Sequence, residues 1–299
     1  MPDMPSKPSA LTGYLFAFGA TAIWSGNFII ARGLHDSIGP VSLAFFRWLV
    51  AVIVFTPFAV KHLVREWSII RARPVYFSIT AFLGVTAFKT LIYIAGHTTT
   101  AMNLSLIAIT FPVFIILFSR ILYKDRLTLK RMLGISLVLI GVITLITHGN
   151  FGVLLQISFK TGDLWMLMAA IVFAVYSLFL KNKPEEISVI ALQFSIFILG
   201  LIFLLPFFLW EQAGIHPPML TRTTILAILY IGIFASLGAF ILWTKAIVIL
   251  GPAKAGMIYY TLPLFSGALA FLFLSERITG IYFLSMVLIL TGIVAANQD

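Results

Sequence analysis

The chain has 299 residues, of which 61% are apolar and only 10% charged, and its net charge is +10. This composition excludes a water-soluble globular protein, because too few polar side chains remain to cover its surface. The basic residues lie in loops between apolar runs, which argues against nucleic-acid binding. Cysteine is absent, so disulfide bonds and thiolate metal sites are excluded.

Ten apolar runs follow one another along the chain, each long enough to cross a bilayer as a helix. They cover residues 11–31, 38–60, 75–96, 99–122, 131–147, 163–181, 187–210, 223–244, 252–274 and 279–296. Backbone groups in hydrocarbon need partners within their own segment, and runs of this length satisfy them as helices rather than as barrel strands. The predicted fold class is therefore an all-α membrane protein with ten transmembrane helices, and the first run is interpreted as a retained span, not a signal peptide.

The loop charges predict how these spans are oriented. With a cytoplasmic N-terminus, fourteen of the twenty Lys and Arg residues lie on the inner side: Lys7, Lys61, Arg65, Arg71, Arg73, Arg120, Lys124, Arg126, Lys130, Arg131, Lys181, Lys183, Lys245 and Lys254. The outer segments then hold only four: Arg32, Lys160, Arg222 and Arg277. Because positive charge gathers in cytoplasmic loops, we expect a multi-pass protein of a bacterial inner membrane with both termini in the cytoplasm.

Two basic residues lie within spans. Arg47 sits near one end of the second run, where we favour a structural role in pairing with loop groups. Lys89 lies near the middle of the third, where an ammonium costs about 2.5 to 3.5 kcal/mol and should face the bundle interior or water. No Asp or Glu lies in mid-span, so its candidate partners are a substrate carboxylate or phosphate, or carbonyls at a helix end. Alternatively, the Lys89 side chain extends to the membrane surface.

Aromatic and polar side chains recur at places that suit the wall of a pocket. The candidates that join Lys89 as substrate-binding residues are Trp24, Asn27, Tyr93, Trp165, Tyr176, Trp243, Tyr259 and Tyr260. Trp24 and Asn27 are three residues apart and share a helix face, and so do Trp165 and Tyr176, which are eleven apart. Such a wall suits a ring-bearing or apolar solute with a polar head. The alternative for each is an interfacial or lipid-facing position.

Two prolines stand in the middle of spans and are candidate hinges. Pro112 and Pro263 each remove a backbone donor and clash with the carbonyl four residues earlier, at Ala108 and Tyr259. The fourth and ninth spans are therefore predicted to be kinked. As a hypothesis, these helices rock when the protein exchanges between inward-facing and outward-facing states.

Small residues mark one face of the fifth span. Gly134 and Gly141 are seven residues apart and therefore share a face, and Ser285 and Gly292 repeat the pattern in the tenth span. Small residues at this spacing let two helices approach closely, so this face is predicted to pack against another helix.

The chain is an internal duplication. A shift of 149 residues pairs Gly13 with Gly162, Trp24 with Phe173, and Pro57 with Pro206. A shift of 151 gives nine identities: Thr110/Thr261, Pro112/Pro263, Phe114/Phe265, Arg126/Arg277, Thr128/Thr279, Leu133/Leu284, Leu137/Leu288, Leu139/Leu290 and Gly141/Gly292. Each half holds five spans, and the odd number forces the second copy to enter the membrane inverted. The predicted repeats are residues 11–147 and 163–297, joined by a connector at 148–162.

Three sets of residues carry a resemblance to a known family. They are Trp24-Ser25-Gly26-Asn27-Phe28, then Pro40 followed by Phe46-Arg47, and then the hairpin Pro112…Lys124-Asp125-Arg126-Leu127-Thr128…Gly134…Gly141 with its second copy Pro263…Glu276-Arg277-Ile278-Thr279…Gly292. In this combination the chain resembles the drug/metabolite transporter superfamily, in the ten-span branch with two EamA-type repeats. It is most similar there to bacterial exporters of amino acids, particularly aromatic ones, and the resemblance implies alternating access around a central site. Ile196 and Phe173 replace Arg47 and Trp24 in the second repeat, so their roles would be asymmetric.

The predicted function is a secondary transporter that exports amino acids, aromatic and neutral ones first. Its expected partners are a small-molecule substrate and the bilayer; no cofactor, no metal and no enzymatic activity are expected, and a monomer is compatible with the sequence. The alternative within the same class is a carrier of a nucleotide sugar or phosphate ester, whose phosphate Lys89 and Arg47 would clamp. A passive channel is disfavoured because no filter-like loop is present, and an enzyme because nucleophile and base are missing. The missing mid-span carboxylate argues against cationic-drug/proton antiport, whereas facilitated efflux and coupling through His97 stay open.

Overall fold

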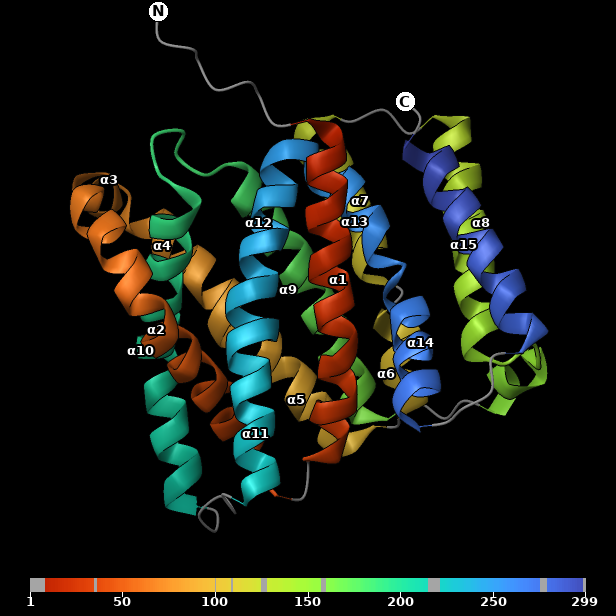
Figure 1. The fold of residues 1–299 in the computed structure, drawn as a ribbon, viewed down its shortest axis with the longest axis horizontal. Coiled ribbons are helices and arrows are strands. Elements are labelled where there is room, and N and C mark those ends of the chain that lie inside the picture. The colour runs from red at the N-terminus through yellow and green to blue at the C-terminus, as the bar shows by residue number, and fades with distance from the viewer. Residues whose placement is uncertain are drawn as a thin grey trace, which may run out of the picture.

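The computed structural model describes residues 9–34, 37–99, 101–108, 110–124, 128–156, 160–214, 221–274 and 279–297. Within these ranges every regular element is a helix, and the helices stand side by side as a bundle (Figure 1). Seven helices of the described part are long and apolar enough to cross a membrane. The predicted all-α membrane fold is confirmed.

Ten helical units follow the ten predicted spans. The first five are α1 (Ala10–Gly33), α2 (Pro40–Arg65), α4 (Pro74–Ala81) with the π-helix η1 (Phe82–Ala87) and α5 (Phe88–Thr98), α6 (Ala101–Ala108) with α7 (Thr110–Tyr123), and α8 (Leu129–Ile146). The second five are α9 (Thr161–Lys181), α10 (Val189–Gly214), α11 (Arg222–Tyr230) with the π-helix η3 (Ile231–Gly238) and α12 (Ala239–Leu250), α13 (Pro252–Tyr259) with α14 (Leu262–Leu274), and α15 (Gly280–Asn297). Two short elements, α3 (Trp67–Ala72) and the 3₁₀ helix η2 (Phe151–Gln156), lie between spans. The second and eighth spans extend past their predicted ends to Arg65 and Leu250, because a helix can continue beyond the hydrocarbon that hydropathy detects.

The two halves repeat each other element by element. A shift of 149 residues carries α2 onto α10 from first residue to last, and a shift of 151 does the same for α6 onto α13 and α8 onto α15. The shift changes inside the third and eighth spans, where η1 has 6 residues and η3 has 8. A π-turn holds more residues than an α-turn. The two residues by which the halves differ are therefore accommodated within η3, without a break in the span.

Equivalent helices of the two halves pack against each other and run in opposite directions. A Cβ atom built on Gly134 of α8 would lie 2.6 Å from the backbone nitrogen of Ala296 in α15, and one on Gly141 would lie 2.9 Å from Cβ of Leu288. Residue numbers rise along α8 while those of its contacts fall along α15, so the two helices are antiparallel (Figure 1). The second repeat is therefore inverted relative to the first, as predicted. The glycine face of α8 is the face that α15 covers.

Two buried carboxylates join α2 and α10 at opposite ends. In the last turn of α10, Glu211 accepts hydrogen bonds from Val41 N at 3.0 Å, from Ser42 N at 2.6 Å and from Ser42 Oγ at 2.5 Å, all at the start of α2. Directly after α2, Glu66 accepts one from Ser188 N at 2.7 Å, just before α10. The first N–H groups of a helix lack intrahelical partners and carry partial positive charge. Each helix of this pair is thus capped by a residue at the end of the other.

The environment of Glu66 favours its charged form. Burial opposes ionisation, but hydrogen bonds from the guanidinium of Arg65 and from Ser188 outweigh it and hold the pKa of the Glu66 carboxyl below its ordinary value. The cap on α10 is therefore a charged one, which interacts more strongly with backbone N–H groups than a neutral acceptor does.

The contact between α8 and α15 leaves no room for a methyl group at Gly134. We expect Gly134→Ala to lower the free energy of unfolding by about 1 to 3 kcal/mol, because the new Cβ would meet backbone atoms of α15 and force the helices apart. The midpoint of thermal unfolding in detergent measures this loss. Gly280→Ala is the matched control, since a Cβ there meets nothing within 4 Å. Equal midpoints for the two variants would contradict the prediction.

Candidate functional site

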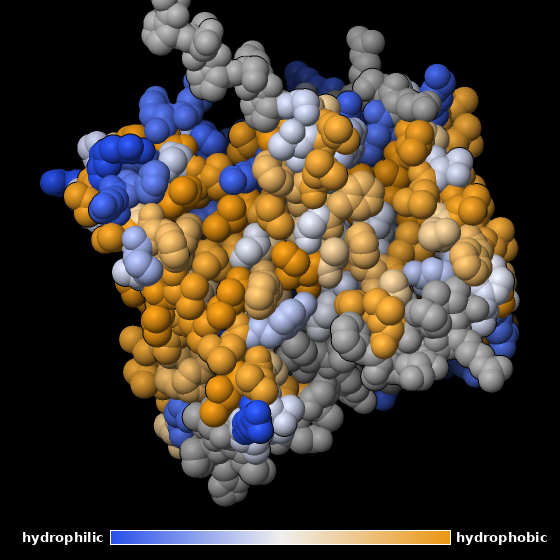
Figure 2. Space-filling view, in the orientation of Figure 1, coloured by the Kyte–Doolittle hydropathy of each residue, from blue (hydrophilic) through white to orange (hydrophobic). Residues whose placement is uncertain are grey.

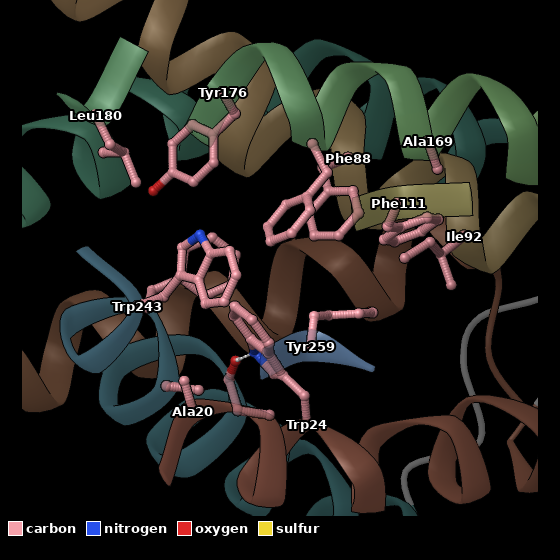
Figure 3. Packing of buried hydrophobic residues seen from close by; sticks show 14 of the residues in the cluster. Ala20, Trp24, Phe88, Ile92, Phe111, Ala169, Tyr176, Leu180, Trp243 and Tyr259 are labelled. Atoms are coloured by element: carbon pink, nitrogen blue, oxygen red, sulfur yellow. Dashed lines mark hydrogen bonds between the residues drawn. The ribbon is translucent and has the colours of Figure 1, made fainter. Parts of the chain in front are cut away.

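Aromatic side chains from both repeats meet at the centre of the bundle. The ring of Trp24 in α1 lies with its centroid 5.7 Å from Phe173, 5.5 Å from Phe240, 5.4 Å from Trp243 and 6.1 Å from Tyr259. We call the whole group the ring cluster, and its members are Trp24, Phe88, Phe111, Phe173, Tyr176, Phe240, Trp243 and Tyr259. Figure 3 shows Tyr176 and Trp243 toward one end and Phe88 and Phe111 toward the other. All eight side chains are buried, so the cluster forms an apolar, π-rich core between the repeats.

Lys89 of α5 is buried at the edge of the ring cluster. Its Nζ atom lies 4.4 Å from the ring centroid of Phe88 and 5.4 Å from that of Trp24. The residue is 3% exposed, so the side chain does not extend to the surface of the bundle. Within the described part of the chain, it makes no hydrogen bond and no ion pair. Aromatic faces compensate a buried charge only partly, which leaves the ammonium suited to an anionic ligand.

Arg47 differs from Lys89 because its guanidinium is held by protein groups. The side chain is fully buried; Nε donates to Ser236 Oγ at 2.7 Å, and Nη1 donates to the Tyr93 hydroxyl at 2.5 Å. These two partners of Arg47 lie in other spans, whereas the sequence favoured groups in loops. The π-helix η3 places Ser236 here, with its own hydroxyl donating to Ile231 O at 2.8 Å. Arg47 and Tyr93 thus join the second, third and eighth spans.

Trp24 is tied to the same π-helix. Its indole Nε1 donates to Ala235 O at 2.9 Å, which is the dashed line in Figure 3. The N–H group of Trp24 is therefore committed to η3, whereas the faces of its ring point into the ring cluster and toward Lys89. Trp24 can contact a ligand by stacking rather than by hydrogen bonding.

The structure separates the predicted binding residues into several groups. Trp24, Tyr176, Trp243 and Tyr259 belong to the ring cluster, Lys89 adjoins it, and Tyr93 binds Arg47. Trp165 is 41% exposed, which agrees with the alternative of a lipid-facing position. It lies near the start of α9, whereas Tyr176 is buried further along the same helix. Tyr260 is buried in the turn between α13 and α14, and the side chain of Asn27 lies outside the described residues.

Phenylalanines make half of the ring cluster, and the sequence did not single them out. They are Phe88, Phe111, Phe173 and Phe240. The chain has 28 phenylalanines, and most spans contain several, so a phenylalanine in an apolar run carries little positional information. The one indication in the sequence was the shift of 149 residues, which pairs Phe173 with Trp24. The two rings are in contact.

One of the two prolines lies beside a break in its span. α13 ends at Tyr259 and α14 begins at Leu262, so Pro263 is the second residue of α14. Proline is tolerated in the first turn of a helix, where its missing N–H would have had no partner. The ninth span therefore consists of two helices, with Tyr259 of the ring cluster at the break. In the fourth span, α6 ends at Ala108 and α7 begins at Thr110, and the predicted kink near Pro112 falls at residue 109, which lies outside the described residues.

Comparisons with known proteins give a consistent assignment. The model of the EamA-like transporter family matches residues 11–147 and 160–298. An "Uncharacterized transporter" of Archaeoglobus fulgidus is 30% identical over 268 residues, which cover 85% of this chain and 86% of that protein. A "Probable amino-acid metabolite efflux pump" of Escherichia coli is 25% identical over 287 residues, 93% of this chain and 92% of the pump. A solved crystal structure superposes with a TM-score of 0.76 at 19% identity and covers 96% of this chain and 97% of the other, which indicates a shared fold.

The contrast between the two buried cations predicts opposite effects on stability. Arg47→Met would leave Ser236 and Tyr93 without their donor, and we expect it to lower the free energy of unfolding by about 1 to 3 kcal/mol. Lys89→Met would remove a buried charge that has no protein acceptor, so we expect unchanged or higher stability. Thermal unfolding of both variants in detergent measures the difference. A Lys89→Met protein as destabilised as Arg47→Met would show that Lys89 is part of the structural framework.

Proposed function

The chain belongs to the EamA-like transporter family of the drug/metabolite transporter superfamily, and on this premise we propose that it exports amino acids, aromatic and neutral ones first. The observation that carries the proposal is the Lys89 ammonium, which lies against aromatic rings without a hydrogen-bond or ion-pair partner in the described part of the protein. An aromatic amino acid brings a carboxylate for Lys89 and a ring for the ring cluster. The Escherichia coli relative named as an amino-acid metabolite efflux pump supports this substrate class.

Transport would proceed by alternating access, with the repeats 11–147 and 163–297 moving against each other about the connector 148–162. The ring cluster is built by both repeats, so a relative movement changes which side of the membrane can reach it. The carboxylate caps lie at opposite ends of α2 and α10, Glu211 at one end and Glu66 at the other. Opening toward one side would separate these helices at one end while the other cap holds.

The distribution of charge supports a cytoplasmic position for both termini. The start of α1 and the end of α15 lie at the same end of the bundle (Figure 1). Hydrophilic residues gather at that end, most visibly around α3, above a broad hydrophobic surface (Figure 2). By the positive-inside rule this end faces the cytoplasm, with both termini there.

The substrate class can be tested by counterflow in proteoliposomes. We expect labelled phenylalanine or tryptophan to exchange saturably, with stimulation by unlabelled amino acid on the opposite side, and Lys89→Met to reduce this exchange at least about tenfold because the carboxylate loses its counter-charge. Lys130→Met, at an exposed position in the first turn of α8, is the matched control and should exchange normally. Exchange of nucleotide sugars or phosphate esters without amino acids would favour the alternative carrier, and non-saturable flux a channel.

The hinge role of the two prolines can be tested in the same assay. We expect Pro112→Ala and Pro263→Ala to slow exchange several-fold with little change in the half-saturation concentration, because alanine restores a backbone donor that proline lacks and stiffens the span. Pro57→Ala is the control, since Pro57 lies inside the unbroken helix α2. A hinge role would be refuted by unchanged exchange rates in both variants.

A further inference from the structure

The first helix of each repeat packs through a glycine against a span of the other repeat. A Cβ built on Gly13 of α1 would lie 2.7 Å from Cγ of Leu250, the last residue of α12. One built on Gly162 of α9 would lie 2.9 Å from Cβ of Thr99, which directly follows α5. The shift of 149 residues carries Gly13 onto Gly162, and the shift of 151 carries Thr99 onto Leu250. The two contacts are therefore equivalent.

These two contacts lie at opposite ends of the bundle. α1 begins at the end that holds both termini (Figure 1). Because the second repeat is inverted, α9 begins at the other end. In the proposed orientation, the Gly13 contact faces the cytoplasm and the Gly162 contact lies on the outer side. Alternating access requires that one end opens while the other stays closed, so the strength of each contact decides which state is favoured.

The outer contact contains a buried carboxylate. Asp163, in the first turn of α9, is 4% exposed and accepts hydrogen bonds from Thr99 Oγ1 at 2.5 Å and from Asn103 Nδ2 at 2.9 Å. Thr99 follows α5, and Asn103 lies in α6. Asp163 also accepts a hydrogen bond from Lys160 N at 2.8 Å, which caps its own helix. One carboxylate thus joins α9 to two spans of the first repeat.

The inner contact has different residues at the equivalent positions. By the shifts of 149 and 151 they are Tyr14 for Asp163, Leu250 for Thr99 and Lys254 for Asn103. None of them is a carboxylate, and Gly13 packs there against the apolar side chain of Leu250. Hydrogen bonds to a carboxylate are stronger than those between neutral groups. Separating α9 from α5 therefore breaks a different kind of contact from separating α1 from α12.

The carboxylate caps of α2 and α10 do not produce this difference between the ends. Glu211 acts at the outer end of that pair and Glu66 at the inner end, so the pair is held at both. Asp163 adds a buried carboxylate on the outer side, between α9 and the spans of the first repeat. Movement of α9 away from these spans would take the carboxylate from two of its three donors.

We propose that Asp163, with Thr99 and Asn103, forms a latch that holds the outer end of the bundle closed, so that the carrier without cargo favours the state open to the cytoplasm. This is the side on which the cargo of an exporter binds. The inference rests on the proposed function, because it assumes alternating access. Hydrogen bonds made in one state only shift the equilibrium toward that state. Asp163 is a positioning residue, because it acts on the contact between helices.

The chain has no cysteine, so single cysteines can probe the two ends separately. Ala95 lies one turn before Thr99, and the shift of 151 carries it onto Ala246; both side chains are fully buried. Ala95→Cys therefore reports opening of the outer end, and Ala246→Cys reports opening of the inner end. The reaction rate of each with a membrane-impermeant maleimide is measured on the full-length protein in lipid nanodiscs, where both faces are accessible.

The latch predicts a change at one reporter only. We expect Asp163→Ala to raise the reaction rate of Ala95→Cys about tenfold and to leave that of Ala246→Cys equal or lower, because the outward-open state gains population. Thr99→Val keeps the cap on α9 and removes one bond of the latch, so it should raise the Ala95→Cys rate by a smaller factor. Glu186→Ala, at an exposed position, is the matched control and should change neither rate.

Each outcome separates the latch from the proposed function. An unchanged Ala95→Cys rate in Asp163→Ala overturns the latch while amino-acid export stands. Equal increases at both reporters assign Asp163 to the general stability of the fold and also overturn the latch. The maleimide reaction needs no cargo, so a protein that exchanges no amino acid overturns the proposed substrate class, whereas the labelling rates still decide the latch.

Discussion

Hydrocarbon offers no hydrogen bonds, so every interruption of a spanning helix has to be satisfied from inside the protein. In the described part of this chain three spans are interrupted, at η1, at η3, and between α13 and α14 beside Pro263. Trp24 donates to a carbonyl of η3, and the Arg47 guanidinium holds a hydroxyl of the same segment. Irregular backbone at membrane depth is tolerated only where protein or a cavity surrounds it. The interruptions therefore lie where the two repeats meet, and the side chains that serve them form the framework of the candidate site.

The buried charges are distributed unevenly between the two repeats. Arg47 is held by hydroxyl groups, Lys89 lies over aromatic faces, and the sequence places no acidic residue in the middle of a span. Positive charge with little compensation in a medium of low dielectric constant repels cationic solutes and attracts anionic groups over a long range. The second repeat has neutral side chains at the related places, Ile196 for Arg47 and Phe240 for Lys89, so the interior is cationic on one side and neutral on the other. In the proposed site, this asymmetry would favour one orientation of a solute with an anionic group.

Much of the architecture could be predicted from the sequence, because a membrane-spanning helix can be recognised from the length and hydropathy of its segment. The ten spans, the inversion, the break near Pro263, and the packing face of Gly134 each follow from a local pattern. The π-helices could not be predicted in this way, although the change of shift from 149 to 151 recorded their unequal lengths. The contact of Arg47 with Ser236 could not be predicted because η3 sets it, and the exposure of Trp165 could not be predicted because a shared helix face says nothing about depth. Which phenylalanines meet is likewise a property of packing.

The reciprocal caps on α2 and α10 have a consequence for biogenesis. When only the first five spans have been synthesised, the start of α2 lacks the carboxylate of Glu211, which lies at the far end of a helix made later. The glycine face of α8 similarly lacks α15, which comes from the second repeat. Neither contact can therefore form until the second repeat has been inserted.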